Sequence, residues 1–360
     1  MMAMSQTQRR KAWRNIYMAS WLVILMGVVY VQKQNQDALG RSLRRLKSSR
    51  NLSNNHRRRK LSSSTKNAIE TKTENGRPII YTYFEYNPDW EKGDFGSPEE
   101  QKEMLQTWAR SWRNHGWEPK VLYKRHAEKH PYFEKFEEIL DKVKIKYYDH
   151  ICFHRWIAMS MYGGYMSDYD TYPVDMPPET FKILPNSGRF TAYDNNIEGG
   201  AIPSLLSGTQ EEWRTMMGKI LKLMATHKGE FTSDMRVLTE LNSKEPGSFV
   251  ILNLVQSGIP QTPAGKLDCE FLYRRHALAV HYSHRSQEDA LKSKFFVESE
   301  HPDALSRSHY AKHFQMLYER KCTQEYAAGY KNKDWYKVTV ENRKQDMVGM
   351  FGANYVSKTA

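Results

Sequence analysis

The sequence predicts an α/β protein whose predominantly parallel sheet is covered by helices and preceded by a transmembrane helix and a disordered stem. From Arg77 onward, short β-rich runs alternate with amphipathic helical segments, an order typical of parallel sheets flanked by helices. Ahead of them lies a 16-residue apolar run, residues 16–31. Between the two, residues 32–76 are rich in Ser, Asn, Arg and Lys and contain no Phe, Tyr or Trp.

The apolar run is interrupted only by Ser20. At about 1.5 Å per residue it would span roughly 24 Å, close to the thickness of the thinner membranes of the early secretory pathway. Basic residues precede it at positions 9, 10, 11 and 14, which favours a cytosolic N-terminus. We therefore expect a cytosolic tail at 1–15, a signal anchor at 16–31 and a lumenal remainder, as in a single-pass type II protein of the Golgi or endoplasmic reticulum membrane. A cleaved signal peptide, a buried core helix and a mitochondrial leader are the alternatives.

The positive charge is concentrated at the N-terminal end. Residues 1–77 contain 17 Lys and Arg and 3 Asp and Glu, whereas the remaining residues contain 37 basic and 38 acidic side chains. A segment with the composition of residues 32–76 cannot bury enough apolar surface to offset its ordering entropy, which predicts a disordered stem. Because the rest of the chain is electrically balanced, no nucleic-acid partner is expected.

Three cysteines and one glycosylation sequon bear on the compartment. Cys152, Cys269 and Cys322 leave at least one thiol unpaired, and either one disulfide or three thiols fits the count. The sequon at Asn51 lies in the predicted stem and would be usable if the stem is lumenal.

The folded domain is expected to span residues 77–360. A β-rich run at 79–84 predicts the first strand, and Ser97-Pro98-Glu99-Glu100 predicts a helix start with an N-cap, a proline at N1 and acidic residues in the first turn. Apolar residues at helical spacing continue that helix towards Gly116. Further strands are expected at 119–123, 165–167 and 190–194, and further helices at 132–143, 150–162 and 235–241. Ligands of such sheets bind beyond the carboxyl ends of the strands.

The segment that is most informative about chemistry follows the strand at 165–167. There, Asp168-Tyr169-Asp170 comes after a helix, a Gly163-Gly164 break and the strand. In an extended chain, residues i and i+2 face the same side, so both carboxylates would converge on one cation. Carboxylate oxygens suit Mn²⁺ or Mg²⁺. A D-x-D triplet alone is more often a solvated turn, but the elements before it favour metal binding.

This region contains an arginine, a Tyr-Gly-Gly-Tyr turn and a pair of aspartates, in the strings Arg155-Trp156-Ile157-Ala158, Tyr162-Gly163-Gly164-Tyr165 and Asp168-Tyr169-Asp170. It resembles the DXD sugar-binding region of glycosyltransferases with the Rossmann-like GT-A fold. The resemblance is closest to the group of initiating mannosyltransferases, α-galactosyltransferases and capsular polysaccharide enzymes. Many members have an aliphatic residue and another aspartate where this chain has Met166-Ser167, which puts the donor-sugar contacts in doubt but not the metal site.

The resemblance implies catalytic roles for Asp168, Asp170 and Arg155. Asp170 would bind the metal directly, and Asp168 would face the nucleotide ribose or reach the metal through water. Arg155 would lie near the donor sugar and its phosphates.

The resemblance also implies that Gly163, Gly164 and Tyr165 form part of the donor-binding turn. The two glycines would let the backbone approach the donor, which a Cβ would obstruct. A histidine late in the chain often supplies a further metal ligand in such enzymes. Here the segment 279–286 resembles that element, and His281 is preferred to His284. Either histidine could instead be a hydrogen-bonded core or surface residue.

Four more residues are expected to contact the donor. Tyr81 and Tyr83 on the first strand could flank the nucleotide base, although tyrosines in a sheet are more often buried. Asp194 and Asp234 fall in segments where the related enzymes contact the donor sugar and the acceptor. The alternative for Asp234 is a helix N-cap.

The sequence therefore predicts a metal-dependent glycosyltransferase that transfers a hexose from a nucleotide-diphosphate sugar to a glycan or another hydroxyl acceptor, with retention of configuration. Mn²⁺ or Mg²⁺ would neutralise the leaving diphosphate. The expected partners are the nucleotide sugar, the glycan acceptor and, through residues 16–31, a membrane; the oligomeric state is left open. The alternatives are an inactive membrane-tethered binding protein, a functional basic stem that binds anionic lipid, and a nucleotidyltransferase. The sequence contains no P-loop, G-x-S-x-G or H-E-x-x-H motif.

Overall fold

The structure is a computed structural model, and it describes residues 70–86, 97–143, 145–195, 199–227, 232–283, 285, 286, 289, 306–323, 325 and 334–352. All of them belong to one unit, residues 68–360. The predicted tail, the predicted anchor, the sequon at Asn51 and the stem up to residue 69 lie outside the described residues. Residues 70–76, which were assigned to the stem, carry β1 (Thr73–Glu74), and β1 pairs with β2 (Arg77–Tyr83).

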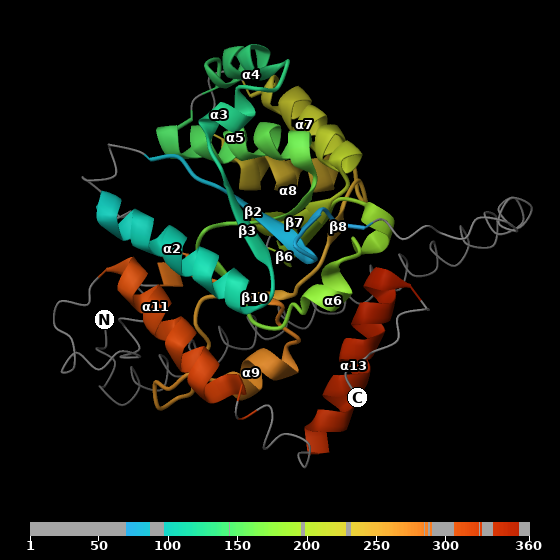
Figure 1. Cartoon of the computed structure of the whole chain (residues 1–360). Helices are drawn as coiled ribbons and strands as arrows, with labels where there is room; N and C mark the ends of the chain where they lie inside the picture. Colours follow the sequence, from blue (N-terminus) through green and yellow to red (C-terminus); the bar gives the residue numbers. More distant parts are fainter. Residues whose placement is uncertain are drawn as a thin grey trace, which may run out of the picture. The chain divides into compact units, whose positions relative to one another are not determined.

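Among the described residues, seven strands form the main sheet (Figure 1). β2 lies between β3 (Glu118–Leu122) and β4 (Gly164–Ser167), and the sheet continues through β7 (Ala201–Gly208) and β6 (Thr191–Asn195) to β8 (Val250–Ile251). The pairs β2–β3, β2–β4 and β6–β8 are parallel. The pairs β1–β2, β4–β7 and β6–β7 are antiparallel.

The predicted fold class, a Rossmann-like and predominantly parallel GT-A sheet behind a transmembrane helix, is wrong. The sheet is mixed, because β7 runs antiparallel to both of its neighbours, β4 and β6. β7 was not predicted as a strand, and it contains Pro203, which cannot donate to a ladder and is unusual in a central strand. The ladder with β6 shifts register between Ala192 and Asp194, so the proline falls at an irregularity. Within the described residues, no helix is long and apolar enough to cross a membrane, and residues 16–31 lie outside them.

The other predicted helices and strands are confirmed, with ends shifted by a few residues. α2 (Pro98–Asn114) begins after Ser97, whose hydroxyl accepts from the backbone N–H of Glu100 while the Glu100 carboxylate accepts from the Ser97 N–H. The predicted helices at 132–143, 150–162 and 235–241 correspond to α4 (Phe133–Leu140), α5 (Tyr147–Tyr162) and α8 (Asp234–Lys244). The remaining helical segments are α3 (Lys124–Ala127), α6 (Pro178–Phe181), η2 (Asn186–Gly188), α7 (Gln210–Met224), α9 (Cys269–Arg274), α11 (Arg307–Leu317), η3 (Tyr318–Cys322) and α13 (Asp334–Phe351).

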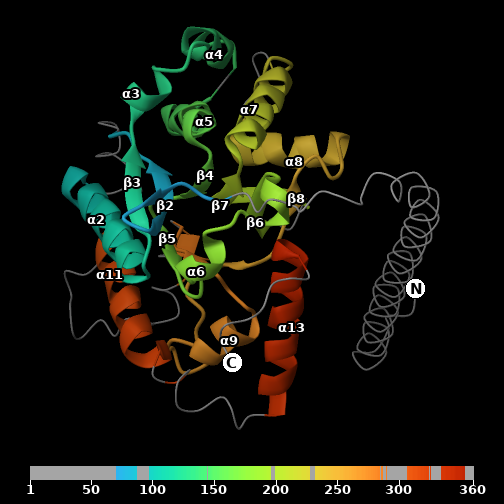
Figure 2. The same ribbon diagram turned by 45° about the vertical axis from the view of Figure 1, so that its right-hand side comes forward.

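Helices cover both faces of the main sheet (Figures 1 and 2). α5, α7 and α8 lie on one face, and α2 and α6 lie on the other. Successive strand residues point to opposite faces, so neighbours enter different cores. On β4, for example, Tyr165 belongs to the same core as Trp108 of α2, whereas Met166 belongs to the opposite core with Trp156 of α5. This burial on both faces leaves the strand ends as the place for a site.

A second, three-stranded sheet lies beyond the carboxyl end of β4. Its central strand is β10 (Ala279–His281), which pairs antiparallel with β5 (Thr171–Pro173) and parallel with β9 (Val255–Ser257). A disulfide between Cys269 and Cys322 joins α9 to η3, and Cys152 is a free thiol. Of the two alternatives that the cysteine count allowed, one disulfide and one thiol is present.

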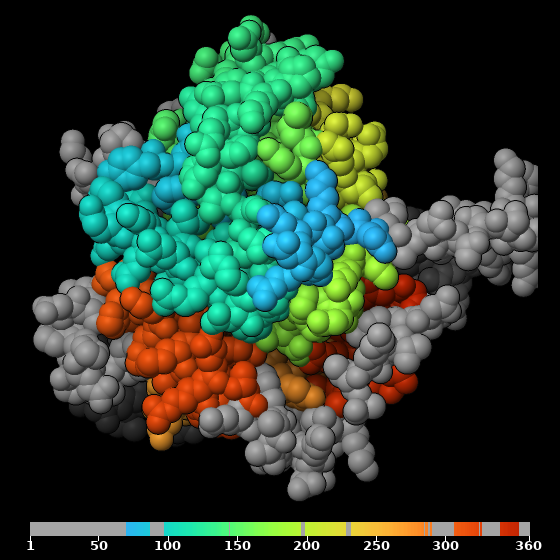
Figure 3. Space-filling model, in the orientation of Figure 1, coloured from blue at the N-terminus to red at the C-terminus, as the bar shows by residue number. Residues whose placement is uncertain are grey.

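α11 packs along α2, as the space-filling view shows with the orange α11 below the blue-green α2 (Figure 3). Glu103 of α2 accepts from Ser308 at 2.8 Å and from Lys312 at 2.7 Å. Further along, the Ser111 hydroxyl donates to Gln315 Oε1 at 2.8 Å. The packing of α11 against α2 places the first residue of α11, Arg307, close to the end of β4.

Candidate active site

Asp168 and Asp170 lie in a turn directly after β4. The Thr171 N–H donates to the Asp168 carbonyl at 3.0 Å, and the Asp168 N–H donates to the Ser204 carbonyl of β7 at 2.8 Å. The chain therefore turns over the aspartate pair instead of staying extended. The sequence predicts that an extended chain puts both carboxylates on one side, whereas in the structure a turn brings them together.

β10 brings His281 to the aspartate pair from a distant part of the sequence. His281 is opposite Thr171 in the β5–β10 register, and the Tyr282 N–H donates to the Asp170 carbonyl at 2.7 Å. One ligand atom each from Asp168, Asp170 and His281 lie within 4.8 Å of one another. His284 lies outside the described residues, so its role stays a prediction.

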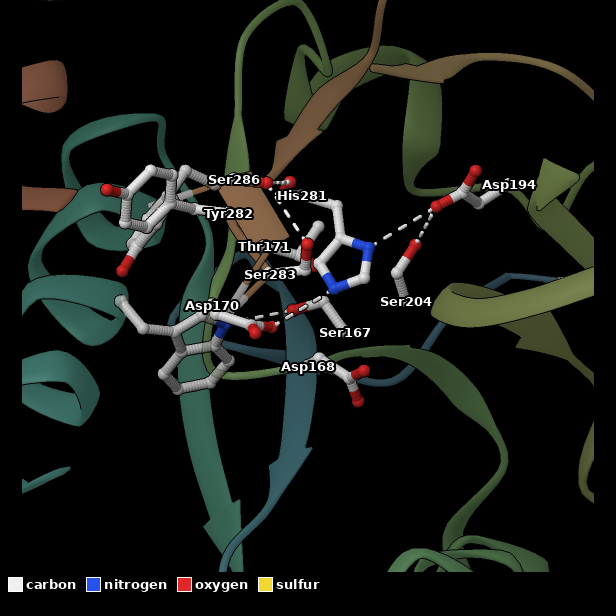
Figure 4. A network of polar contacts seen from close by, with 12 residues as sticks. Ser167, Asp168, Asp170, Thr171, Asp194, Ser204, His281, Tyr282, Ser283 and Ser286 are labelled. Carbon is white, nitrogen blue, oxygen red and sulfur yellow. Dashed lines mark hydrogen bonds and ion pairs between the residues drawn. The ribbon is translucent and has the colours of Figure 1, made fainter. Parts of the chain in front are cut away.

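The His281 imidazole lies between two carboxylates (Figure 4). Its Nε2 is 3.6 Å from Asp170 Oδ1, and its Nδ1 is 3.5 Å from Asp194 Oδ2. Asp194 also accepts from the Ser204 hydroxyl at 2.8 Å. The register shift in the β6–β7 ladder is next to Asp194, and irregularities of this kind re-aim side chains near functional sites. Asp194 therefore supports the histidine from the side opposite Asp170.

Arg155 of α5 is held between two carboxylates. Its guanidinium pairs with Asp168 and with Asp234, whose Oδ2 accepts from Arg155 Nε at 3.0 Å and from the Trp156 indole at 3.1 Å. Asp234 is the first residue of α8, and the N-cap of that helix is Ser233. Asp234 is thus a buried partner that fixes the orientation of Arg155.

A second buried arginine comes from the start of α11. Arg307 pairs with Asp170 through Nη2, and its Nη2 and Nε donate to the Tyr282 carbonyl at 2.9 and 3.3 Å. Asp170 therefore contacts Arg307 through Oδ2 and faces His281 with Oδ1. Nothing in the sequence around residue 307 indicated this role, because it depends on how α11 packs against α2.

These groups border a pocket at the carboxyl ends of β2 and β4. Its wall combines the ion pairs Arg155–Asp168 and Arg307–Asp170 with aromatic side chains. A few converging polar groups among apolar ones are typical of small-molecule sites. The rings of Phe84 and Tyr169 meet edge to face with centroids 5.6 Å apart. The lining residues are Tyr83, Phe84, Glu85, Tyr148, Ile151, Cys152, Arg155, Asp168, Tyr169, Asp170 and Arg307.

The charges of this cluster favour an additional cation. The cluster contains four carboxylates, on Asp168, Asp170, Asp194 and Asp234. The positive charges of the two buried arginines offset two of these four negative charges. Burial raises the pKa of Asp168 to about 6, with Arg155 opposing the rise and Asp170 adding to it. Burial alone would lower the pKa of His281, but Asp170 and Asp194 raise it to about 8. Both pKa values are therefore raised, that of Asp168 by burial and that of His281 by the carboxylates on either side of its ring.

Two tryptophans of α2 hold the aspartate turn at both ends. Trp108 Nε1 donates to Ser167 Oγ at 2.8 Å, and Trp112 Nε1 donates to the Thr171 carbonyl at 3.0 Å. Both side chains are fully buried and lie four residues apart, on the same side of the helix. The helix is therefore hydrogen-bonded to the residues immediately before and after the aspartate pair.

Of the three tyrosines expected at the donor site, only Tyr83 lines the pocket. Tyr81 is buried, and its ring packs on Tyr162 with centroids 5.3 Å apart. Tyr165 is fully buried in the core, where its hydroxyl donates to the Ile183 carbonyl at 3.2 Å. The structure places the latter two in the cores on either side of the sheet.

The two glycines serve local packing and do not line the pocket. Both have positive φ, +65° at Gly163 and +89° at Gly164. A Cβ at Gly163 would lie 2.5 Å from the Gln210 nitrogen, so α7 occupies the space that a side chain would need. The close approach that requires a glycine is that of α7, not that of a donor.

Sequence reasoning missed several lining residues that had a usable signal. Tyr148, Ile151 and Cys152 precede Arg155 by seven, four and three residues on α5, which puts them on one face of the helix. Once Arg155 is a candidate, this periodicity identifies its neighbours. Glu85, by contrast, follows β2 without any pattern that marks it.

Residues 60–202 match a family model described as a domain of unknown function (DUF8765). The chain is similar to that family over this part, which includes Arg155, Asp168, Asp170 and Asp194 but ends before His281 and Arg307. No curated protein matched the chain.

Proposed function

We propose that the chain is a metal-dependent glycosyltransferase that transfers a hexose from a nucleotide-diphosphate sugar to a hydroxyl of a glycan or another acceptor, with retention of configuration. One observation carries the proposal: Asp168, Asp170 and His281 present ligand atoms within 4.8 Å of one another beside a pocket that Arg155 and Arg307 line. Two carboxylates and one imidazole suit a divalent cation. The nitrogen ligand favours Mn²⁺ over Mg²⁺, which prefers oxygen ligands.

In this proposal each residue of the cluster has a separate role. Asp168, Asp170 and His281 would hold the cation, which would neutralise the charge that develops on the leaving diphosphate. Asp194 accepts from the second ring nitrogen of His281 and thereby orients the ring. Arg155 lies in the same pocket, where its positive charge favours phosphate. The aromatic lining offers flat apolar surfaces to a nucleotide base or a sugar ring.

The disulfide supports a location inside the secretory pathway. Disulfides persist in oxidising compartments and are rare in the cytosol. The bond between Cys269 and Cys322 is thus the feature in favour of a lumenal domain in the Golgi or endoplasmic reticulum.

Purified full-length chain incubated with UDP- and GDP-sugars, with and without Mn²⁺, tests the proposal directly. We expect release of a nucleoside diphosphate from one donor, dependent on Mn²⁺. Loss of a residue that only supports a metal ligand costs about 10–100-fold, so Asp170→Asn should lower the rate by more than about 100-fold. Asp141→Asn, an exposed aspartate at the end of α4, is the matched control.

Other outcomes identify the alternatives. Pyrophosphate as the product would indicate a nucleotidyltransferase. A folded chain that binds a nucleotide sugar with Mn²⁺ but releases nothing, even with a range of glycan acceptors, would indicate a binding protein.

A further inference from the structure

A second group of metal-ligating side chains lies between α4 and α5, which are neighbours at the top of Figures 1 and 2. His150 and His154 are four residues apart on α5 and so share one side of that helix. Glu137 of α4 faces them. One ligand atom from each of the three lies within 4.8 Å of the others.

Two distances in this group are in the range expected of a zinc site. Glu137 Oε1 is 2.8 Å from His154 Nε2 and 3.3 Å from His150 Nε2. Ligand atoms that each lie about 2.0–2.1 Å from Zn²⁺ in tetrahedral geometry are about 3.3 Å apart. The His150 contact has this spacing, and the His154 contact is the shorter one, a hydrogen bond that a bound ion would replace. Both histidines present Nε2 to the same carboxylate oxygen.

The other nitrogen of His154 has the partner that a ligating histidine usually has. His154 Nδ1 lies 2.8 Å from Glu85 Oε1. A carboxylate in this position accepts the Nδ1–H, so that Nε2 carries the lone pair and points away from Glu85. The His154 side chain is only 3% exposed, and this partner therefore holds the ring firmly.

His150 supplies a further indication. Its Nε2 is a buried atom that lies 3.3 Å from Glu137 Oε1 as an ion-pair neighbour but forms no well-aligned hydrogen bond among the described residues. Buried polar groups of this kind call for an explanation, and an ion is one of the usual ones. A cation bound by Glu137 would also be within reach of this nitrogen.

We propose that Glu137, His150 and His154 bind Zn²⁺ at a site separate from the aspartate cluster, with Glu85 positioning His154. Two imidazoles and one carboxylate are an established ligand set for Zn²⁺, with the fourth position left to water. The set is richer in nitrogen than the aspartate cluster, so the two sites should select different metals. The Glu137 and His150 side chains are 24% and 21% exposed, which leaves a path for the ion.

The site is connected to the pocket through Glu85. This residue lines the pocket and, on its other side, contacts His154. Occupancy of the site would hold the Glu85 carboxylate in one orientation at the pocket wall. Binding of Zn²⁺ itself does not depend on the proposed glycosyltransferase activity.

Calorimetric titration of the full-length chain with Zn²⁺, after removal of metals with a chelator, tests the proposal. The titration uses Asp170→Asn, which disables the aspartate cluster. We expect one Zn²⁺ per chain. Adding His150→Ala or Glu137→Gln should weaken binding by more than the roughly 100-fold that loss of a residue merely supporting a ligand can cost.

The neighbouring Glu138→Gln on α4 is exposed and should leave the affinity unchanged. Bound Co²⁺ provides a second readout, since a tetrahedral site gives strong visible absorption that His150→Ala should remove. The proposal is overturned if the Asp170→Asn chain, folded by circular dichroism, takes up no Zn²⁺, or if His150→Ala and Glu137→Gln bind it as tightly as their parent. Neither result bears on donor hydrolysis, which is measured separately.

Discussion

His281 has a carboxylate at each ring nitrogen, and the two carboxylates cannot have the same role. Asp170 faces Nε2, whereas Asp194 faces Nδ1 and is bonded to β7 through Ser204. If Nε2 binds the cation, Nδ1 carries the proton and Asp194 accepts it as a hydrogen bond. Asp194 then acts on the metal only through the histidine.

Asp194→Asn keeps the shape of the side chain and removes its charge. We expect the Mn²⁺ concentration for half-maximal activity to rise about 10–100-fold, with a smaller change in the KM for the donor. Ser204→Ala, which removes a donor to Asp194 but keeps the carboxylate, should cause a smaller rise. Electron paramagnetic resonance of bound Mn²⁺ measures the same affinity without turnover. An unchanged affinity in Asp194→Asn would show that Asp194 does not orient the histidine.

The site residues that sequence reasoning identified are those with a local pattern. Arg155, Asp168 and Asp170 belong to one continuous motif, and their association in the structure agrees with that expectation. Arg307 has no such signature, because its contact with Asp170 depends on the packing of a helix far along the chain. Asp234 was singled out, but whether a carboxylate faces a ligand or an arginine is decided by tertiary packing, which one sequence does not show.

Among the elements, α2 is the one whose packing bears most directly on the site. Its tryptophans Trp108 and Trp112 bond the residues on either side of the aspartate pair, and a third, Trp117, lies beyond its end and donates to the Met176 carbonyl at 2.9 Å. Trp112 and Trp117 are both fully buried and both donate to a backbone carbonyl. They differ mainly in distance from the aspartate pair.

This difference makes Trp112→Phe and Trp117→Phe a matched pair. Each change leaves a buried carbonyl without its donor, which should lower the free energy of unfolding by about 1–3 kcal/mol in urea denaturation. Only Trp112→Phe should also weaken Mn²⁺ binding, because only its carbonyl partner, Thr171, adjoins Asp170. Equal losses of Mn²⁺ affinity in the two variants would mean that α2 contributes stability alone.

Element prediction succeeded where local signals agree and failed where they conflict. α2 was predictable from its capping residues and its apolar spacing, and both are present in the structure. β7 was not, since Pro203 and the small residues around it argue against a central strand. β7 nevertheless pairs with β4 on one side and β6 on the other, so tertiary contacts outweigh its low local strand propensity. Because both pairings are antiparallel, the sheet is mixed.

For the molecule as a whole, the disulfide closes a long stretch of chain that contains two site residues. Cys269 and Cys322 are 53 residues apart, and both His281 and Arg307 lie between them. The bond restricts the unfolded chain and ties α9 to η3, next to α11. The positions of His281 and Arg307 should therefore depend on this disulfide more than those of the other site residues do.

Removing the bond with Cys322→Ser, or with reductant, should lower the free energy of unfolding by about 4 kcal/mol on the chain-entropy estimate for a loop of this length. Urea denaturation with and without dithiothreitol measures the loss. Cys152→Ser retains the bond and should respond to dithiothreitol as the wild type does. A midpoint that reductant leaves unchanged in the wild type would contradict the expectation.

The same covalent link changes what proteolysis would do to the molecule. A single peptide-bond cleavage between Cys269 and Cys322 would produce two fragments that stay joined through sulfur. If the cut fell between His281 and Arg307, each fragment would carry one of these partners of Asp170, and neither could diffuse away. The nicked protein would migrate as one species on a gel until the disulfide was reduced, so a protease could convert the chain to a two-chain form with His281 and Arg307 still tethered together.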